Sequence, residues 1–125
     1  MKQRTDTPSE KSDLFRRLEK LMREKAVYTN PNLTRRMLAD ALQTNENYLY
    51  LAIKEACDGE TVTDYINDHR LEHAKRLLCE TTDAKIESIA IDSGFRLRQT
   101  FYRLFKKHFG MTPVEYREQM TGRRR

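Results

Sequence analysis

The sequence predicts an all-α fold of seven helices, and three observations support it. Only 4 of the 125 residues are Gly and 3 are Pro, which is too few for the many turns of an all-β protein. Apolar residues recur at spacings of three and four in one segment after another. Thr, Asn and Asp precede these segments as helix caps. With 38% hydrophobic and 34% charged residues, the composition alone also suits a disordered chain, so the periodicity decides for a folded domain.

The first predicted helix runs from Pro8 to Val27, after a Thr-Pro-Ser-Glu start in which Thr7 and Glu10 form a capping box. Its apolar positions are Leu14, Leu18, Leu21 and Met22. We expect this helix to pack against the helices that follow it, and the alternative is a linker or docking surface toward another domain.

Two shorter helices follow an Asn-Pro-Asn turn at residues 30–32. Thr34 is expected to start the first of them and Asn45 to cap the second, which ends near Asp58-Gly59. The apolar residues of the first are Met37, Leu38, Ala41 and Leu42. Those expected to face inward in the second are Tyr48, Leu49, Ala52, Ile53 and Ala56.

Four further helices complete the prediction. A capping box from Thr61 to Asp64 opens the longest one, whose apolar stripe comprises Val62, Tyr65, Ile66, Ala74, Leu77 and Leu78. Asp83 is expected to cap a short helix that carries Ile86, Ile89 and Ala90. The sixth helix follows Gly94, is closed by Gly110 and is marked by Leu97, Phe101, Leu104 and Phe105. A Thr-Pro-x-Glu start at residues 112–115 opens the last helix.

The helices repeat after about 51 residues. The pairs at a distance of 51 are Ala39 with Ala90, Gly59 with Gly110 and Tyr65 with Tyr116, and those at 52 are Leu49 with Phe101 and Ile53 with Phe105. The second copy therefore has one more residue in the turn before its longer helix and one fewer after that helix. A short helix, a tight turn and an exposed longer helix form a helix-turn-helix unit, so two such units are predicted.

Positive charge is concentrated at the C-terminal end. The net charge is +5 and the pI is about 9.3. From Gly94 onward there are nine Lys and Arg against two Glu, a net charge of +7, which leaves −2 for residues 1–93. This asymmetry favours a nucleic-acid-binding face in the second unit. The alternative is a solvated helix face followed by a basic tail.

The motifs of the second copy resemble a known family. They are Ile89-Ala90, Gly94-Phe95, residues 101–107 (Phe-Tyr-Arg-Leu-Phe-Lys-Lys), residues 110–113 (Gly-Met-Thr-Pro) and residues 115–117 (Glu-Tyr-Arg). They resemble, in order and spacing, the signature of the DNA-binding domain of AraC/XylS transcription regulators from bacteria. The linker pattern from Tyr65 to Leu78 also resembles that family, and the resemblance covers about residues 33–117.

The resemblance implies two helix-turn-helix units joined by a long helix, with each unit addressing a major groove. The expected organisation is an N-terminal helix or arm at 1–29, the first unit with the linker helix at 30–80, the second unit at 81–120 and a basic tail at 121–125. The implied partner is double-stranded DNA, read in a sequence-specific manner in the cytoplasm, at the bacterial nucleoid. RNA polymerase is a further partner if the protein activates transcription.

The resemblance also implies which residues contact DNA. In the second unit, Gln99 and Arg103 occupy base-reading positions and Arg98 lies beside them; Gln suits adenine and Arg suits guanine. The candidates for base contact in the first unit are Asn47, Tyr50 and Leu51. The candidates for phosphate contact are Arg96, Tyr102, Lys106, Lys107, Lys54 and Arg35. Because residues 34–60 carry three basic and five acidic residues, we expect the second unit to supply most of the phosphate affinity.

Arg96 departs from the family pattern, because a small or acidic capping residue is commoner at this point. We therefore expect water or a phosphate to cap the start of the sixth helix.

Other chemistries are disfavoured. His69 to His73 spell the H-x-x-E-H zinc motif, but no third ligand has a recognisable context, so no metal site is expected. Cys57 and Cys79 lack C-x-x-C spacing and suggest a reducing compartment. Without a phosphate-binding Gly-rich loop or a nucleophile elbow, neither an enzyme nor a cofactor is expected.

The sequence also bears on membrane contact, on further domains and on alternative functions. The sequence has no apolar run near the roughly 20 residues of a membrane span, so no membrane contact is expected. It also has no room for a sensor or effector domain, so it is either a short stand-alone regulator or the output part of a larger protein. The alternative function is a helical protein-interaction module with a solubilising basic tail. RNA binding is a third alternative, but the sequence lacks the stacking aromatic residues typical of proteins that read single-stranded RNA.

Overall fold

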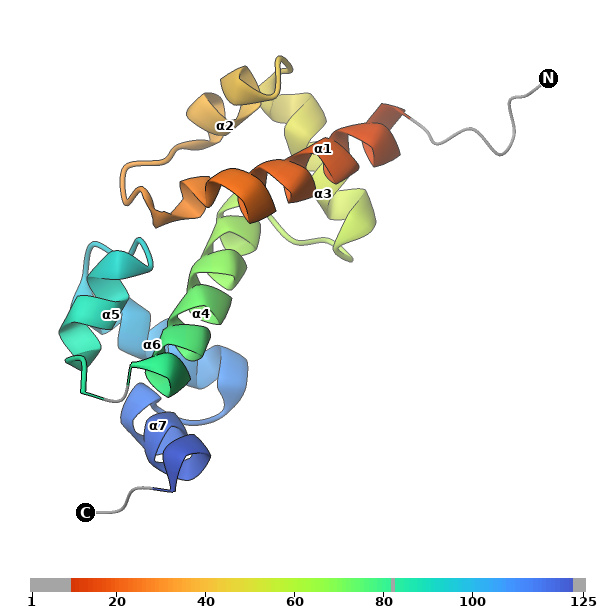
Figure 1. Cartoon of the computed structure of the whole chain (residues 1–125). Helices are drawn as coiled ribbons and strands as arrows, with labels where there is room; N and C mark the ends of the chain where they lie inside the picture. Colours follow the sequence, from red (N-terminus) through yellow and green to blue (C-terminus); the bar gives the residue numbers. More distant parts are fainter. Residues whose placement is uncertain (1–9, 82, 123–125) are drawn as a thin grey trace. The chain divides into compact units, whose positions relative to one another are not determined.

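The computed structural model describes residues 10–81 and 83–122, and these are all-α, with seven α-helices and one 3-10 helix (Figure 1). The elements are α1 (Glu10–Lys25), η1 (Val27–Thr29), α2 (Arg35–Ala41), α3 (Glu46–Ala56), α4 (Val62–Glu80), α5 (Ile86–Asp92), α6 (Arg98–Phe109) and α7 (Pro113–Thr121). The predicted fold class is therefore confirmed. The chain divides into two units, of which the first holds α1 to α3 and the first residues of α4, up to Ile66. The second holds residues 28–31 and the chain from Asn67 on.

In the first unit, α1 and α2 both pack on α3 (Figure 1). The buried side chains are Leu14, Leu18, Met22, Leu38, Ala39, Leu42, Leu49, Ala52, Ile53, Val62, Tyr65 and Ile66. Arg17 donates a hydrogen bond to the carbonyl of Leu42, which is the C-cap of α2. The hydroxyl of Tyr65 donates to Glu19, and its burial together with this bond raises the pKa of Tyr65. The first helix thus packs within the first unit, the simpler of the two expectations.

In the second unit, α6 packs against α5 and α7 around an aromatic core. The buried cluster comprises Leu71, Ala74, Leu78, Ile89, Ala90, Phe95, Phe101 and Phe105. The ring of Phe105 lies 5.6 Å from that of Phe101 and 4.6 Å from that of Phe109, measured between centroids. These rings fix one face of α6 in the core, so its opposite face is in solvent.

The predicted repeat is visible in both units. Ala39 and Ala90 are buried in equivalent short helices, and the pairs Leu49 with Phe101 and Ile53 with Phe105 are fully buried. Four residues separate α2 from α3 and five separate α5 from α6, as the change of spacing predicts.

Most predicted caps are formed. The side chains of Thr34 and Asn45 accept hydrogen bonds from the backbone N–H groups of Met37 and Tyr48. Capping boxes begin α4, between Thr61 and Asp64, and α7, between Thr112 and Glu115. The hydrogen bond from the backbone N–H of Thr112 lowers the pKa of Glu115. The predicted capping box at Thr7 lies outside the described residues.

Several boundaries differ from the prediction. The first helix ends at Lys25 because Ala26 has a positive φ of 48°, after which the chain forms η1. Asp83 does not cap α5, because the turn between Thr81 and Ala84 moves the N-cap to Lys85, which makes no side-chain cap hydrogen bond. Ala56 was expected to face inward but is exposed, and two apolar residues of the predicted short helix, Met37 and Ala41, are exposed as well. Short helices bury a single narrow stripe, and these residues lie beside it.

Two arginines of the second unit bind backbone carbonyls instead of facing solvent. Arg117 on α7 donates to the carbonyls of Leu78, Thr81 and Ala84, at and just beyond the end of α4, at 3.2, 2.8 and 2.7 Å. Arg70 on α4 donates to the carbonyls of Tyr28 and Asn30. The last carbonyls of a helix have no partner within it, so Arg117 satisfies groups that otherwise need water. The charged guanidinium of Arg117 therefore stabilises the fold.

Candidate nucleic-acid interface

The solvent face of α6 is polar and basic. Gln99, Arg103, Lys106 and Lys107 are all exposed, whereas Phe101 and Phe105 are buried on the opposite face. Gln99 and Arg103 are one helical turn apart and lie on the same strip. Within the residues that the structure describes, neither side chain makes a hydrogen bond or an ion pair, so their donors are available to a ligand.

Arg98, the third predicted base reader of this unit, is already engaged. Its Nε lies 3.4 Å from Oε2 of Glu87 on α5, and its guanidinium lies 5.2 Å from the ring centroid of Tyr102. Tyr102, predicted to contact a phosphate, is half-buried. Sequence reasoning missed Glu87, because no local pattern shows that α5 places a carboxylate beside the start of α6.

The start of α6 has no side-chain cap. Its N-cap is Leu97 rather than Arg96, so the departure noted in the sequence falls one residue later. Leu97 makes no side-chain cap hydrogen bond, and the first turn contains no acidic residue. Because the first N–H groups of a helix lack internal partners and carry the positive end of its dipole, this end favours an anion. The expected anion or water at the start of α6 would therefore lie beside Leu97 and not beside Arg96.

An exposed hollow of about 500 Å³ adjoins this end of α6. Its lining residues are Leu97, Arg98, Gln99 and Tyr102. Leu97 is one of the apolar residues that mark the predicted sixth helix, and its side chain is 63% exposed. The sequence carries one signal of this arrangement, since none of the usual capping residues stands at position 97. Two predicted base readers and one predicted phosphate contact thus share a surface with an exposed leucine.

The first unit presents a weaker site on α3. Asn47 and Lys54 are exposed, whereas Tyr50 and Leu51 are half-buried. The Nζ of Lys54 lies 5.7 Å from the ring centroid of Tyr50. On the neighbouring helix, Nε of Arg35 lies 3.8 Å from the carboxylate of Glu46, so this predicted phosphate contact has an acidic partner.

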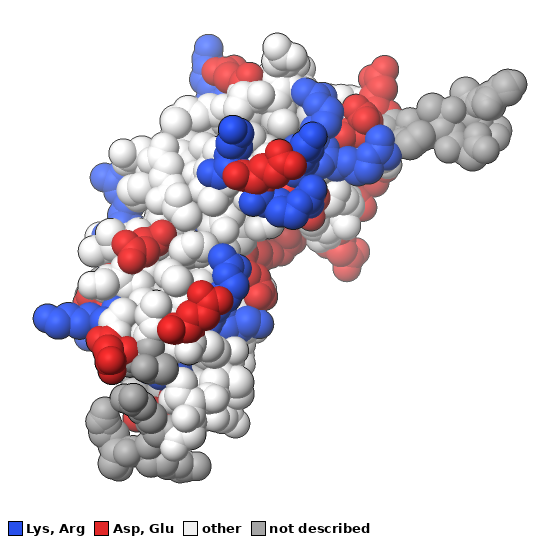
Figure 2. Space-filling view, in the orientation of Figure 1, with Lys and Arg blue, Asp and Glu red and all other residues white. Residues whose placement is uncertain are grey.

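Basic side chains also gather over α1, where acidic ones are interleaved with them (Figure 2). Arg16 pairs with Asp13 at 2.9 Å and Lys11 pairs with Glu55 at 3.2 Å. This helix therefore presents a mixed surface, unlike the exposed face of α6.

The histidines of the H-x-x-E-H motif have structural partners. His73 Nδ1 lies 3.1 Å from Oγ of the buried Ser93, and burial lowers the pKa of His73. The ring of His69 stacks on Tyr28, with centroids 5.5 Å apart. Across the described part of the chain, no group of three or more His, Cys, Asp or Glu could hold a metal ion.

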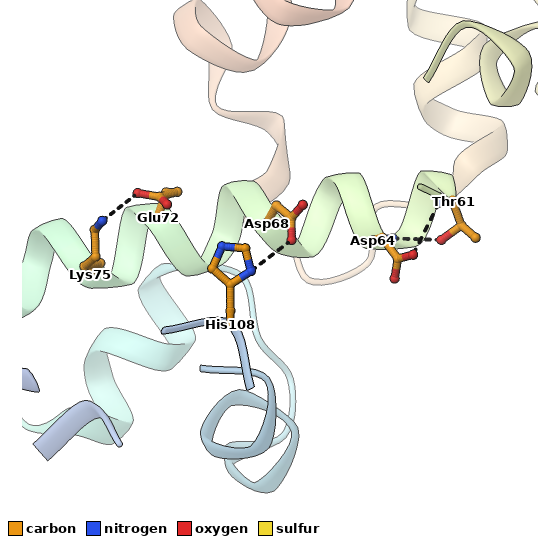
Figure 3. A network of polar contacts seen from close by, with 6 residues as sticks. All are labelled: Thr61, Asp64, Asp68, Glu72, Lys75 and His108. Atoms are coloured by element: carbon orange, nitrogen blue, oxygen red, sulfur yellow. Dashed lines mark hydrogen bonds and ion pairs between the residues drawn. The ribbon is translucent and has the colours of Figure 1, made fainter. Parts of the chain in front are cut away.

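His108 near the end of α6 points toward Asp68 of α4, with Nδ1 3.6 Å from the carboxylate, while Lys75 pairs with Glu72 on the same helix (Figure 3). A carboxylate therefore faces His108 on this side.

No helix among residues 10–81 and 83–122 combines the length and the apolar character that crossing a membrane requires.

Comparison with known proteins gives a consistent result. A family model described as a helix-turn-helix domain matches residues 38–119. The chain is 36% identical over 95 residues to the transcriptional regulatory protein YesN of Bacillus subtilis, and 36% identical over 92 residues to the melibiose operon regulatory protein of Escherichia coli. Each alignment covers 74% of this chain, but only 26% and 30% of these relatives. The chain therefore spans less than a third of their length.

Solved structures agree with the sequence matches. The C-terminal domain of the two-component response regulator yesN from Fusobacterium nucleatum has a TM-score of 0.73 and 31% identity, and covers 86% of this chain and 100% of that domain. The C-terminal domain of AraT, a response regulator from Geobacillus stearothermophilus, has a TM-score of 0.75 and 28% identity, with 89% and 88% covered.

Proposed function

Because the chain belongs to the AraC/XylS-type helix-turn-helix family of transcription regulators, we propose that it binds double-stranded DNA in a sequence-specific manner through two recognition helices, α3 and α6. The observation that carries this proposal is the exposed face of α6. It combines unpaired donors on Gln99 and Arg103 with the cations of Lys106 and Lys107. Gln and Arg side chains read base edges in the major groove, and Lys side chains contact phosphates.

We assign the dominant role to the second unit. Its recognition helix has basic residues in the last turn and an uncapped start, and both features attract phosphates. The first unit would add weaker, partly apolar readout through Asn47, Tyr50 and Leu51. Arg35 and Lys54 would provide its few phosphate contacts.

The role in the cell follows from the same proposal. The domain acts in the cytoplasm as a regulator and not as an enzyme. Its further partners are RNA polymerase, where it activates transcription, and a sensor or effector domain. The relatives support the proposal of a sensor or effector domain, because more than two thirds of each relative lies outside the matched part.

Selection of bound duplexes from a random DNA pool tests the proposal. We expect a defined site to be enriched, with an affinity that falls steeply as salt rises. Arg103→Ala is expected to raise Kd for this site about 5- to 150-fold, the range for one bidentate base contact. Tyr50→Ala should cost less. A larger loss for Tyr50→Ala overturns the dominance of the second unit, and binding without salt dependence favours a protein-interaction module.

Replacing Glu87 by Gln is expected to tighten DNA binding up to about fivefold at low salt. Arg98 must leave an exposed ion pair to reach DNA, and such pairs are worth roughly 0.2–1 kcal/mol. The variant removes that competition together with a negative charge near the proposed DNA face. Fluorescence anisotropy with the selected duplex measures the gain, which should shrink as salt rises. Asp92→Asn removes the same charge from α5, and an equal gain there contradicts the role of the pair with Arg98.

A further inference from the structure

Leu97 is an exposed apolar residue at a position where helices favour a polar one. It is the N-cap of α6, and its backbone is extended, with φ −119° and ψ 127°. Replacing a polar N-cap by an apolar residue typically costs about 1 kcal/mol of stability. Local choices that weaken a fold are expected at functional sites. The exposed Leu97 is therefore expected to have a role in function and not in stability.

The surroundings of Leu97 indicate what that role is. The hollow beside it is lined by Tyr102, Arg98 and Gln99. Arg98 and Gln99 are two of the three predicted base readers of α6, so the leucine belongs to the same surface. An apolar side chain next to base-reading groups meets one apolar feature in the major groove, the 5-methyl group of thymine.

We propose that Leu97 is a specificity-determining residue that contacts a thymine methyl group beside the bases read by Arg98 and Gln99. This inference rests on the proposed function and adds a preferred base to it. Leucine has no hydrogen-bonding group, so it distinguishes thymine from cytosine and from uracil only through the methyl group. Tyr102 forms the second apolar wall of the contact, and its hydroxyl stays available to a phosphate.

The test removes the methyl group alone. Each thymine of the selected duplex is replaced in turn by deoxyuridine, and Kd is measured for the wild-type chain, Leu97→Ala and Leu97→Ser. We expect one thymine at which the wild type loses about three- to fivefold, the effect of exposing one methyl group. Both variants should bind the thymine duplex with a similar loss and should not distinguish it from the uracil duplex at that position.

Two controls separate readout from folding. Leu97→Ser introduces a good N-cap, so its Tm should rise while discrimination of the methyl group is lost. Ile91→Ala truncates an apolar side chain that is 64% exposed but does not line the hollow, and it should keep the discrimination.

The possible outcomes are distinct. Absence of any enriched duplex overturns the proposed function together with this inference. An enriched site at which no thymine methyl matters, or at which Leu97→Ala keeps the wild-type response to uracil, overturns the inference alone. Loss of the uracil response in Ile91→Ala overturns its assignment to Leu97.

Discussion

Replacing Gly94 by Ala is expected to destabilise the second unit by about 3–5 kcal/mol. Gly94 has a positive φ of 103°, and a Cβ placed there would lie 2.3 Å from the carbonyl oxygen of Tyr28 and 2.7 Å from Nε of Arg70. Strain at positive φ costs roughly 1–2 kcal/mol and overpacking roughly 1–3 kcal/mol. The added methyl would also disrupt the hydrogen bond from Nε of Arg70 to the carbonyl oxygen of Tyr28, which are 2.7 Å apart.

Urea unfolding followed by circular dichroism measures the change. Hydrogen exchange of the amides in α5 and α6 assigns it to the second unit. Gly110→Ala is the matched control, because Gly110 also has a positive φ, of 80°, but no atom lies within 4 Å of the added Cβ. That variant should lose only the roughly 1–2 kcal/mol of backbone strain. Equal losses in the two variants contradict the close approach of Tyr28.

Replacing Arg117 by Ala is expected to cost about 3 kcal/mol of stability. The guanidinium donates to three carbonyls at and beyond the end of α4, and hydrogen bonds that involve a charged group contribute roughly 1.5–3 kcal/mol each without adding fully. Arg117→Lys should recover part of the loss, because an ammonium group cannot reproduce the fork of donors. Urea unfolding of the three proteins measures the series.

Arg103→Ala is the control for charge. Arg103 is exposed on α6, so its removal should change stability by no more than about 0.5 kcal/mol. The two arginines are thus expected to show opposite profiles, with Arg103 affecting DNA affinity and Arg117 affecting stability. A stable Arg117→Ala protein with weakened DNA binding contradicts the structural role of Arg117.

The helices and their caps could be predicted because their causes are local. The spacing of Leu49 and Ile53 and of Phe101 and Phe105 fixes the inner face of each recognition helix. Gly110 ends α6 as predicted, in the left-handed conformation. Predictions failed where a cap was assigned one or two residues too early, at Asp83 and Arg96, because turn length is set by packing.

The sequence could not predict which arginines have partners within the protein. Counted along the sequence, Arg98, Arg103 and Arg117 contribute equally to the net charge of +7 from Gly94 onward. In the structure, Arg117 binds carbonyls and Arg98 pairs with Glu87, and only Arg103 is exposed without such partners. The predicted base and phosphate contacts stay predictions until binding is measured.

The sequence by itself determined the all-α fold, the repeated helix-turn-helix pattern and the polar face of α6, since each depends on residues a few positions apart. Tertiary structure decided what no local pattern contains: the close approach of Tyr28 to Gly94, the carbonyls that Arg117 satisfies and the exposure of Leu97. These features depend on residues far apart in the sequence, or on where a helix begins. Packing alone brings such groups within hydrogen-bonding distance or leaves them in solvent.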